Sequence, residues 1–132
     1  MPQLQQMVLQ DRANPPVDHT FTPRNIVGGV GELVESQGVP VGEKRFTVSL
    51  RKTQNGRYKA TLKLAIPVVA AKLVDGISTP TVVRTAYVEV NTDFAGTSSQ
   101  EERADAIGLM TSALASDNTM INSVVTDLEG IY

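Results

Sequence analysis

The stretch RFTVSLRKTQNGRYKATLKLAI, Arg45 to Ile66, alternates between polar and apolar residues along almost its whole length. Because successive side chains of a strand point to opposite faces of a sheet, this pattern predicts a β-hairpin with one apolar face and one cationic face. The apolar positions are Phe46, Val48, Leu50, Tyr58, Leu62, Leu64 and Ile66, and the polar ones are Arg45, Thr47, Ser49, Arg51, Arg57, Lys59, Thr61 and Lys63.

The turn of this hairpin follows from matching the two faces. A two-residue Asn55-Gly56 loop would place Arg51 opposite Ala60 and would pair polar with apolar positions along the ladder. A three-residue loop that ends in a left-handed Gly56 pairs polar with polar instead, and is a common hairpin connection. The loop is then Gln54-Asn55-Gly56, and the predicted pairs are Arg51 with Lys59, Ser49 with Thr61, and Thr47 with Lys63.

The length and composition indicate one small soluble domain. The chain has 132 residues, a formal net charge of -2, a single histidine and no cysteine. These counts exclude a disulfide framework and a thiolate metal site, so we expect no cofactor and no metal, and interpret His19 as an ordinary surface or hairpin residue. No apolar run reaches the ~20 residues of a membrane span and no signal peptide opens the chain, so we expect a cytosol-made protein. Because Pro2 is small, we also expect Met1 to be removed.

Outside the central hairpin the pattern indicates further strands. Gln5 to Asp11 and Asp18 to Pro23 flank a turn and are predicted to form a hairpin. The glycines of Ile26 to Gly31 lack the spacing of a phosphate-binding loop and are interpreted as a bend or a point of close packing. We further expect a weak strand at Glu32 to Glu35, a turn at Gly38 to Gly42, a loop over most of Pro67 to Thr81, and a strand at Val82 to Asp93.

A helical pattern replaces the strand pattern in the last third of the chain. A serine at 98 or 99 followed three residues later by a glutamate is a capping-box signature, and a 3.6-residue apolar stripe predicts a helix over Ser99 to Ser116. Asp117-Asn118-Thr119 restarts a second helix. Its stripe is Ile121, Val124, Val125 and Leu128. Strands followed by helices predict an α+β fold, with the helices on one face of an antiparallel sheet.

No catalytic signature is present in the sequence. One histidine and no cysteine leave the usual pairs of base and nucleophile incomplete. The carboxylates Glu101 and Glu102 fall at a helix start, where the helix dipole accounts for them. The sequence therefore predicts a protein that is not an enzyme.

The cationic face of the hairpin needs an explanation, because like charges that face each other across strands reduce stability. We count five cations on it against a single acid, Glu89, which the later strand contributes together with Tyr87 if it joins in matching register. Thr47, Ser49 and Thr61 can line a shallow pocket there. Cations for phosphates and an aromatic ring for base stacking are typical of single-stranded or looped RNA binding. The alternative is a solvated polar face whose lysines discourage edge pairing.

The chain also resembles the coat proteins of small single-stranded RNA bacteriophages, the leviviruses. The similarity runs in order from MVLQD through the two helices. Its strongest segments are NIVGGVGELVES (Asn25 to Ser36), EKRFTVSLRKTQNGRYKATLKLAIPVV (Glu43 to Val69), TPTVVRTAYVEV (Thr79 to Val90) and the terminal GIY.

The resemblance implies a fold and an assembly. It implies one coat-protein domain over 1–132, with an N-terminal hairpin (1–23), a five-stranded antiparallel main sheet (30–94) and two C-terminal helices (98–132). Two subunits are expected to form an intertwined dimer with a continuous ten-stranded sheet. Such dimers build a quasi-equivalent T=3 icosahedral capsid, made in the bacterial cytoplasm, whose sheet faces the genome. The dimer also binds an operator hairpin in the RNA, which represses replicase translation and directs packaging.

Carried over by position, the resemblance assigns RNA contacts to the cationic face. Thr47, Ser49, Thr61 and Lys63 match a pocket for an unpaired adenine, with Val30 at its edge, and Tyr87 matches the residue that stacks on a loop base. Arg45, Arg51 and Lys59 match phosphate contacts, Asn55 matches a hairpin-loop contact, and Glu89 and Asn91 match variable positions. An acid at Glu89 accepts from a base amino group but repels phosphate. Without cysteine, the shell is expected to rely on packing alone.

Two other classes of protein fit parts of the sequence. A cellular regulator that binds single-stranded RNA without forming a shell accounts for the cationic face. An adhesin or pilus-like structural subunit accounts for the alternation, but leaves Tyr87 and the hydroxyl residues unexplained. Electron microscopy of the expressed protein distinguishes these alternatives.

Overall fold

The alternating stretch forms the hairpin that its pattern predicts. A computed structural model describes residues 2–36 and 40–132, and in it β4 (Lys44–Lys52) pairs antiparallel with β5 (Arg57–Val74). The loop follows the three-residue prediction, since Gly56 has a left-handed φ of 76° and its N–H donates to the Thr53 carbonyl at 3.0 Å. All three predicted pairs are present: Arg51 with Lys59, Ser49 with Thr61, and Thr47 with Lys63.

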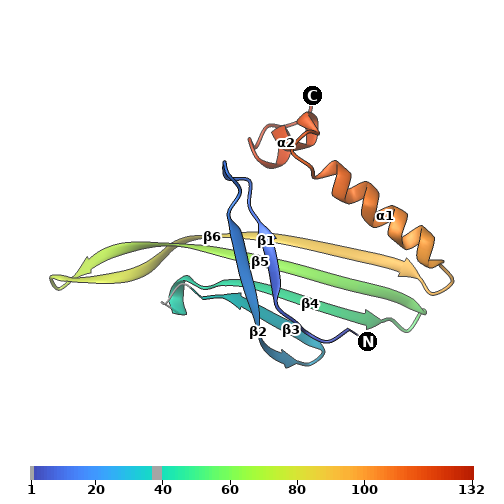
Figure 1. Cartoon of the computed structure of the whole chain (residues 1–132), viewed down its shortest axis with the longest axis horizontal. Helices are drawn as coiled ribbons and strands as arrows, with labels where there is room; N and C mark the ends of the chain where they lie inside the picture. Colours follow the sequence, from blue (N-terminus) through green and yellow to red (C-terminus); the bar gives the residue numbers. More distant parts are fainter. Residues whose placement is uncertain (1, 37–39) are drawn as a thin grey trace. The chain divides into compact units, whose positions relative to one another are not determined.

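The strands form a six-stranded sheet in which each strand is hydrogen-bonded to its neighbour in sequence, in the order β1 to β6 (Figure 1). The other four are β1 (Met7–Gln10), β2 (Asp18–Val27), β3 (Val30–Glu35) and β6 (Ile77–Ala95). The first part of β2, up to Phe21, pairs with β1, and the part from Thr22 pairs with β3 across a bulge between Pro23 and Asn25. The predicted N-terminal hairpin is therefore present, but its second strand continues to Val27 and joins the main sheet.

The glycines between β2 and β3 have the two roles that were predicted. Gly28 and Gly29 have φ of 59° and 79° and form the tight turn between the strands. Gly31 is buried, and a Cβ there would lie 2.9 Å from a methyl group of Leu4. Of the turn expected at Gly38 to Gly42, residues 38 and 39 lie outside the described residues, and Pro40–Gly42 forms a 3₁₀ turn.

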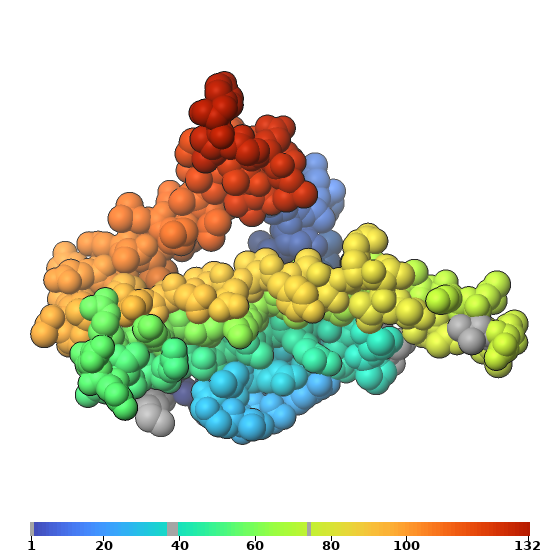
Figure 2. Space-filling model, turned by 180° about the vertical axis from the view of Figure 1, so that it is seen from behind, coloured from blue at the N-terminus to red at the C-terminus, as the bar shows by residue number. Residues whose placement is uncertain are grey.

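The loop expected over Pro67 to Thr81 is wrong. β5 continues to Val74 and β6 begins at Ile77, so that only Asp75 and Gly76, with φ of 53° and 80°, form the turn. Since β4 pairs with β5 only as far as Ala65, the rest of β5 lies with β6 in a two-stranded arm that runs past β3 and β4 (Figures 1 and 2). Prolines are depleted in strands, and Pro67 and Pro80 concealed this arm in the sequence.

The core of the sheet is small. Among the described residues, the buried apolar side chains are Phe21, Leu33 and Val34, and Phe21 meets Phe46 edge-on with ring centroids 6.2 Å apart. Apolar positions farther along the strands stay open to solvent, since Leu50 is 66% exposed and Val88 54%. The alternating apolar residues thus form an apolar surface, and most of that surface is not fully buried in the single chain.

The helices lie in a second unit, Phe94–Tyr132, which follows the first, Met1–Asp93. The N-cap of α1 (Gln100–Ala113) is Ser99, whose hydroxyl accepts from the Glu102 N–H at 3.2 Å, as the capping signature predicts. Asn118 caps α2 (Thr119–Val125), but Leu128 lies beyond that helix with a φ of 60°, so the predicted stripe is one turn too long. In the described part of the chain, no helix is long and apolar enough to cross a membrane.

Candidate nucleic-acid interface

One face of the sheet brings the predicted hydroxyl residues together in rows across strands. Val30 lies opposite Ser49, and Ser49 lies opposite Thr61, so these three residues form one row over β3, β4 and β5. The next row holds Thr47 opposite Lys63. The three hydroxyl residues are half-buried, whereas Val30 and Lys63 are exposed. The predicted adenine-contacting residues are therefore neighbours, although they come from three strands.

The row continues onto β6 through a chain of hydrogen bonds. The Asn91 amide nitrogen donates to the Glu89 carboxylate at 2.9 Å, and the Thr61 hydroxyl donates to the Asn91 amide oxygen at 3.1 Å. An ionised carboxylate can only accept, so Glu89 orients the Asn91 amide, and the amide oxygen in turn accepts the hydrogen bond that the Thr61 hydroxyl donates. Thr61 is thus left with lone pairs to offer a ligand, which suits an exocyclic amino group.

Cations lie on both sides of this row. Arg51 faces Lys59 across β4 and β5 towards the turn, whereas Lys63 and, farther along, Arg45 lie towards the other end. Asn55 is exposed in the turn itself, separated from the hydroxyl row by the Arg51–Lys59 pair.

The acid count made from the sequence is wrong, because two further carboxylates lie on this face. Asp93 accepts from Arg57 Nε at 2.7 Å and lies 3.9 Å from Lys59 Nζ. Glu32 lies opposite Thr47 and pairs with Arg24 at 3.5 Å. Asp93 was missed although it continues the odd-numbered alternation of its strand by one step beyond Asn91, and that continuation is the signal that finds it.

Tyr87 is an exposed residue of β6, with 79% of its surface open to solvent. It has the same parity along the strand as Glu89 and Asn91, which are joined by their own hydrogen bond and reach Thr61. Alternation therefore places the ring on the face that carries the hydroxyl row. An exposed ring beside hydroxyls and cations is suited to base stacking.

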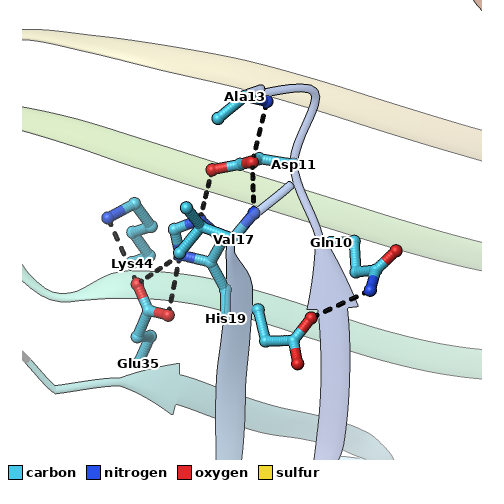
Figure 3. A network of polar contacts seen from close by, with 8 residues as sticks. Gln10, Asp11, Ala13, Val17, His19, Glu35 and Lys44 are labelled. Atoms are coloured by element: carbon cyan, nitrogen blue, oxygen red, sulfur yellow. Dashed lines mark hydrogen bonds and ion pairs between the residues drawn. The ribbon is translucent and has the colours of Figure 1, made fainter. Parts of the chain in front are cut away.

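A separate polar cluster surrounds His19 (Figure 3). By strand alternation its member Glu35 lies on the same face of β3 as Leu33. The imidazole Nε2 lies 2.8 Å from Asp11, the imidazole Nδ1 lies 2.9 Å from Glu35, and Glu35 also pairs with Lys44 at 3.2 Å. The imidazole therefore links the turn after β1 to β3 and β4. The sequence correctly placed His19 in the hairpin but gave no sign of this bridge, because its partners are distant in sequence.

The charges of this cluster shift one another's pKa values. Hydrogen bonds from His19 and from the Val17 and Ala13 N–H groups lower the pKa of Asp11 to about 2. Bonds to Asp11 and Glu35 raise the pKa of His19. Burial raises the pKa of Glu35, but its bonds to His19 and Lys44 outweigh burial, so that the net shift is downward. In the described residues, no group of His, Asp and Glu side chains is arranged to hold a metal ion.

An antiparallel sheet followed by two C-terminal helices is the fold that this chain shares with solved viral capsid proteins. The chain belongs to the levivirus coat protein family, whose sequence model matches residues 2–132. It is 53% identical over 130 residues to the capsid protein of Pseudomonas phage PRR1, covering 98% of this chain and 99% of that one. It is 33% identical over 109 residues to the capsid protein of Enterobacteria phage SP, covering 80% of each.

Solved structures agree with this assignment. A virus-like particle of Beihai levi-like virus 21 matches with a TM-score of 0.81 and 29% identity, over 99% of both chains. The capsid protein of bacteriophage GA matches with a TM-score of 0.82 over 98% of both chains, and at 21% identity it supports the fold alone. The chain is therefore a structural capsid protein and not an enzyme.

Proposed function

We propose that this protein assembles as dimers into a T=3 icosahedral shell around a single-stranded RNA genome and that the face described above binds that RNA. The observation that carries the RNA-binding part is the row Val30–Ser49–Thr61, which continues to Asn91 and Glu89 and has cations on both sides. Such a row offers acceptors and donors to a base edge, while the flanking cations donate hydrogen bonds to phosphate oxygens. The RNA is an operator hairpin whose binding represses replicase translation and directs packaging.

Each predicted site residue has a role in this proposal. The hydroxyl residues and Lys63 hold an unpaired adenine with Val30 at its edge, and Tyr87 stacks on a loop base. The basic residues at both ends contact phosphates, and the Glu89–Asn91 pair sets the hydrogen-bond polarity beside the stacked base. The full set is Val30, Arg45, Thr47, Ser49, Arg51, Asn55, Lys59, Thr61, Lys63, Tyr87, Glu89 and Asn91.

The dimer is supported by surfaces that are left open in one chain. β6 is 19 residues long and lies at the edge of the sheet, where unpaired backbone groups are a template for another strand. If β6 pairs with the β6 of a second subunit, the five strands β2, β3, β4, β5 and β6 of each subunit form one ten-stranded sheet. Ile107 and Met110 of α1 are 46% and 55% exposed, and the sheet leaves Leu50 open as well. We propose that each subunit's helices cover the partner's sheet, so that both units form one coat-protein domain.

Assembly into a shell is supported by the relatives. The structure from Beihai levi-like virus 21, which matches this chain over its length, is that of a virus-like particle. The PRR1 relative is a capsid protein of nearly the same extent. We propose that this protein is likewise located in the capsid of a virion and that it is synthesised in the bacterial cytoplasm.

The test of RNA recognition separates the contribution of phosphate contacts to affinity from the contribution of base contacts. The affinity of assembly-blocked dimers is measured at several salt concentrations on the operator hairpin and on a scrambled one. Lys63→Ala is expected to weaken binding to both RNAs and to reduce the salt dependence by about one phosphate's worth. Tyr87→Ala is expected to weaken the operator by about 1–3 kcal/mol more than the scrambled hairpin, because a stacking partner is lost. Equal losses on both hairpins would contradict the assignment of a base-reading site.

A further inference from the structure

The carboxylate of Asp93 on β6 holds two cations of the neighbouring strand. Its Oδ1 accepts from Arg57 Nε at 2.7 Å, and its Oδ2 lies 3.9 Å from Lys59 Nζ. Lys59 in turn faces Arg51 across β4 and β5. The acid therefore stands at the turn end of the cationic face, where it neutralises one part of that face.

These ion pairs are weak enough for a phosphate to replace the carboxylate. The side chains of Arg57 and Asp93 are 46% exposed and that of Lys59 41%, so solvent and salt screen the attraction. An RNA phosphate offers the same anionic oxygens to the same N–H donors, and Arg binds phosphate in the same fork geometry as carboxylate. Asp93 and the RNA backbone thus compete for one pair of cations.

Three other cations of this face, among the described residues, are not held by a carboxylate in this way. In the part of the chain that the structure describes, Arg45, Arg51 and Lys63 take part in no ion pair. Lys63 lies in the row next to the Ser49–Thr61 pair, and Arg51 lies in the row on the other side. The unopposed charge is therefore concentrated beside the residues that read a base, and the opposed charge lies at the edge towards β6.

We infer that Asp93 is a specificity-determining residue, which restrains phosphate binding at Arg57 and Lys59 so that RNA is held mainly beside the hydroxyl row. This inference rests on the proposed RNA-binding function and deepens it. An RNA that fits the row keeps its base contacts and its contacts with Arg51 and Lys63 whether or not Asp93 is present, and only its phosphate contact with Lys59 depends on Asp93. An RNA that offers only its backbone gains from any released cation, so Asp93 acts mainly against unmatched RNA.

The test compares Asp93→Asn with the parent, using the full chain below its assembly concentration, on the operator and scrambled hairpins. Asp93→Asn is expected to raise the affinity for the scrambled hairpin by about two- to fivefold, the worth of exposed ion pairs, and to change the operator less. The salt dependence on the scrambled hairpin is expected to steepen by about one phosphate's worth. Asp18→Asn is the matched control, because Asp18 pairs with Gln10 in the β1–β2 hairpin and its loss changes the net charge equally.

Arg57→Gln, made alone and together with Asp93→Asn, gives a double-mutant cycle that tests whether Asp93 acts through its ion-pair partner Arg57. It is expected to alter RNA binding little in the parent but to remove much of the gain in the Asp93→Asn background. An unchanged affinity of Asp93→Asn for scrambled RNA, or an equal rise of that affinity in Asp18→Asn, would overturn the inference. In either case the proposed RNA site would still stand if Tyr87→Ala reduced the preference for the operator hairpin. If the parent bound neither hairpin, the proposed function would fail and this inference with it.

Discussion

At the scale of single residues, the Glu89–Asn91–Thr61 chain determines which hydrogen-bonding groups this face would offer to a base in the proposed complex. Glu89 can only accept hydrogen bonds, and it therefore orients the Asn91 amide so that the Thr61 hydroxyl donates its hydrogen bond to the amide oxygen. A glutamine at position 89 can donate as well as accept, so the amide is free to turn and Thr61 is free to donate. The Glu89 carboxylate is two hydrogen bonds removed from Thr61, yet in the proposed complex it sets the hydrogen-bond polarity that Thr61 presents to a base.

Glu89→Gln is therefore expected to relax the choice between adenine and a purine that carries a carbonyl in place of the amino group. The measurement is the affinity for operator hairpins with adenine or hypoxanthine at the unpaired position. The preference for adenine is expected to fall by about fivefold, which is the worth of one net hydrogen bond. Asp105→Asn in α1 is the control for net charge. A preference that is unchanged in Glu89→Gln would show that Thr61 is not oriented through Asn91.

The cluster around His19 predicts a pH dependence of stability. The raised pKa of His19 means that its contribution is fully present below its ordinary value of 6.5 and is lost as the pH rises through the raised pKa. The lowered pKa values of Asp11 and Glu35 act on the other side, because the contribution of Asp11 is present above 3.8 and is lost as the pH falls towards about 2.

The free energy of unfolding is therefore expected to be lower at about pH 8 than at about pH 6, and His19→Gln is expected to flatten this difference. Urea unfolding of the parent and the variant at both pH values measures it. A parent with equal stability at both values would show that the imidazole bridge between the turn after β1 and the strands β3 and β4 is not linked to folding.

At the scale of elements, the alternation of polar and apolar residues predicted the β4–β5 hairpin and its register, because the polarity of each strand residue indicates which face of the sheet it occupies. The α1 cap was predictable for the same reason, since Ser99 and Glu102 are close in sequence. The arm of β5 and β6 was not, because Pro67 and Pro80 interrupt the strand pattern. The ion pairs of Asp93 depend on the alignment of β5 with β6, which strand alternation alone does not determine.

The Asp75-Gly76 turn predicts a separation between folding and assembly. Gly76 has a φ of 80°, which a β-branched residue adopts only at a cost of about 1–2 kcal/mol. Since the arm lies beyond the last pairing of β4 with β5 at Ala65, Gly76→Val is expected to leave the dimer folded and to change shell yield or geometry. Sedimentation and electron microscopy measure the two effects.

Gly130→Val is the control for this substitution, because Gly130 has open space around it and no left-handed φ. It is expected to leave both the dimer and the shell unchanged. Loss of the dimer in Gly76→Val would show that the arm is needed for folding, and would contradict its role in assembly alone.

At the scale of the whole molecule, the small core of one chain predicts an obligate dimer. Large apolar side chains remain open on both units, including Leu50 and Val88 on the sheet and Met110 on α1. An interface that buries such surfaces leaves no stable folded monomer. Unfolding is therefore expected to depend on protein concentration, and dilution to nanomolar concentration is expected to unfold the chain. A folded monomer at that concentration, seen by circular dichroism and sedimentation, would refute the dimer.

Electron cryo-microscopy of the expressed full-length chain tests the central claim most directly. We expect closed icosahedral shells of dimers joined along β6, with the β3–β6 face that carries Thr61 and Tyr87 turned inward against RNA density. Soluble chains without shells, or shells in which that face is turned outward and away from the RNA, would contradict the account.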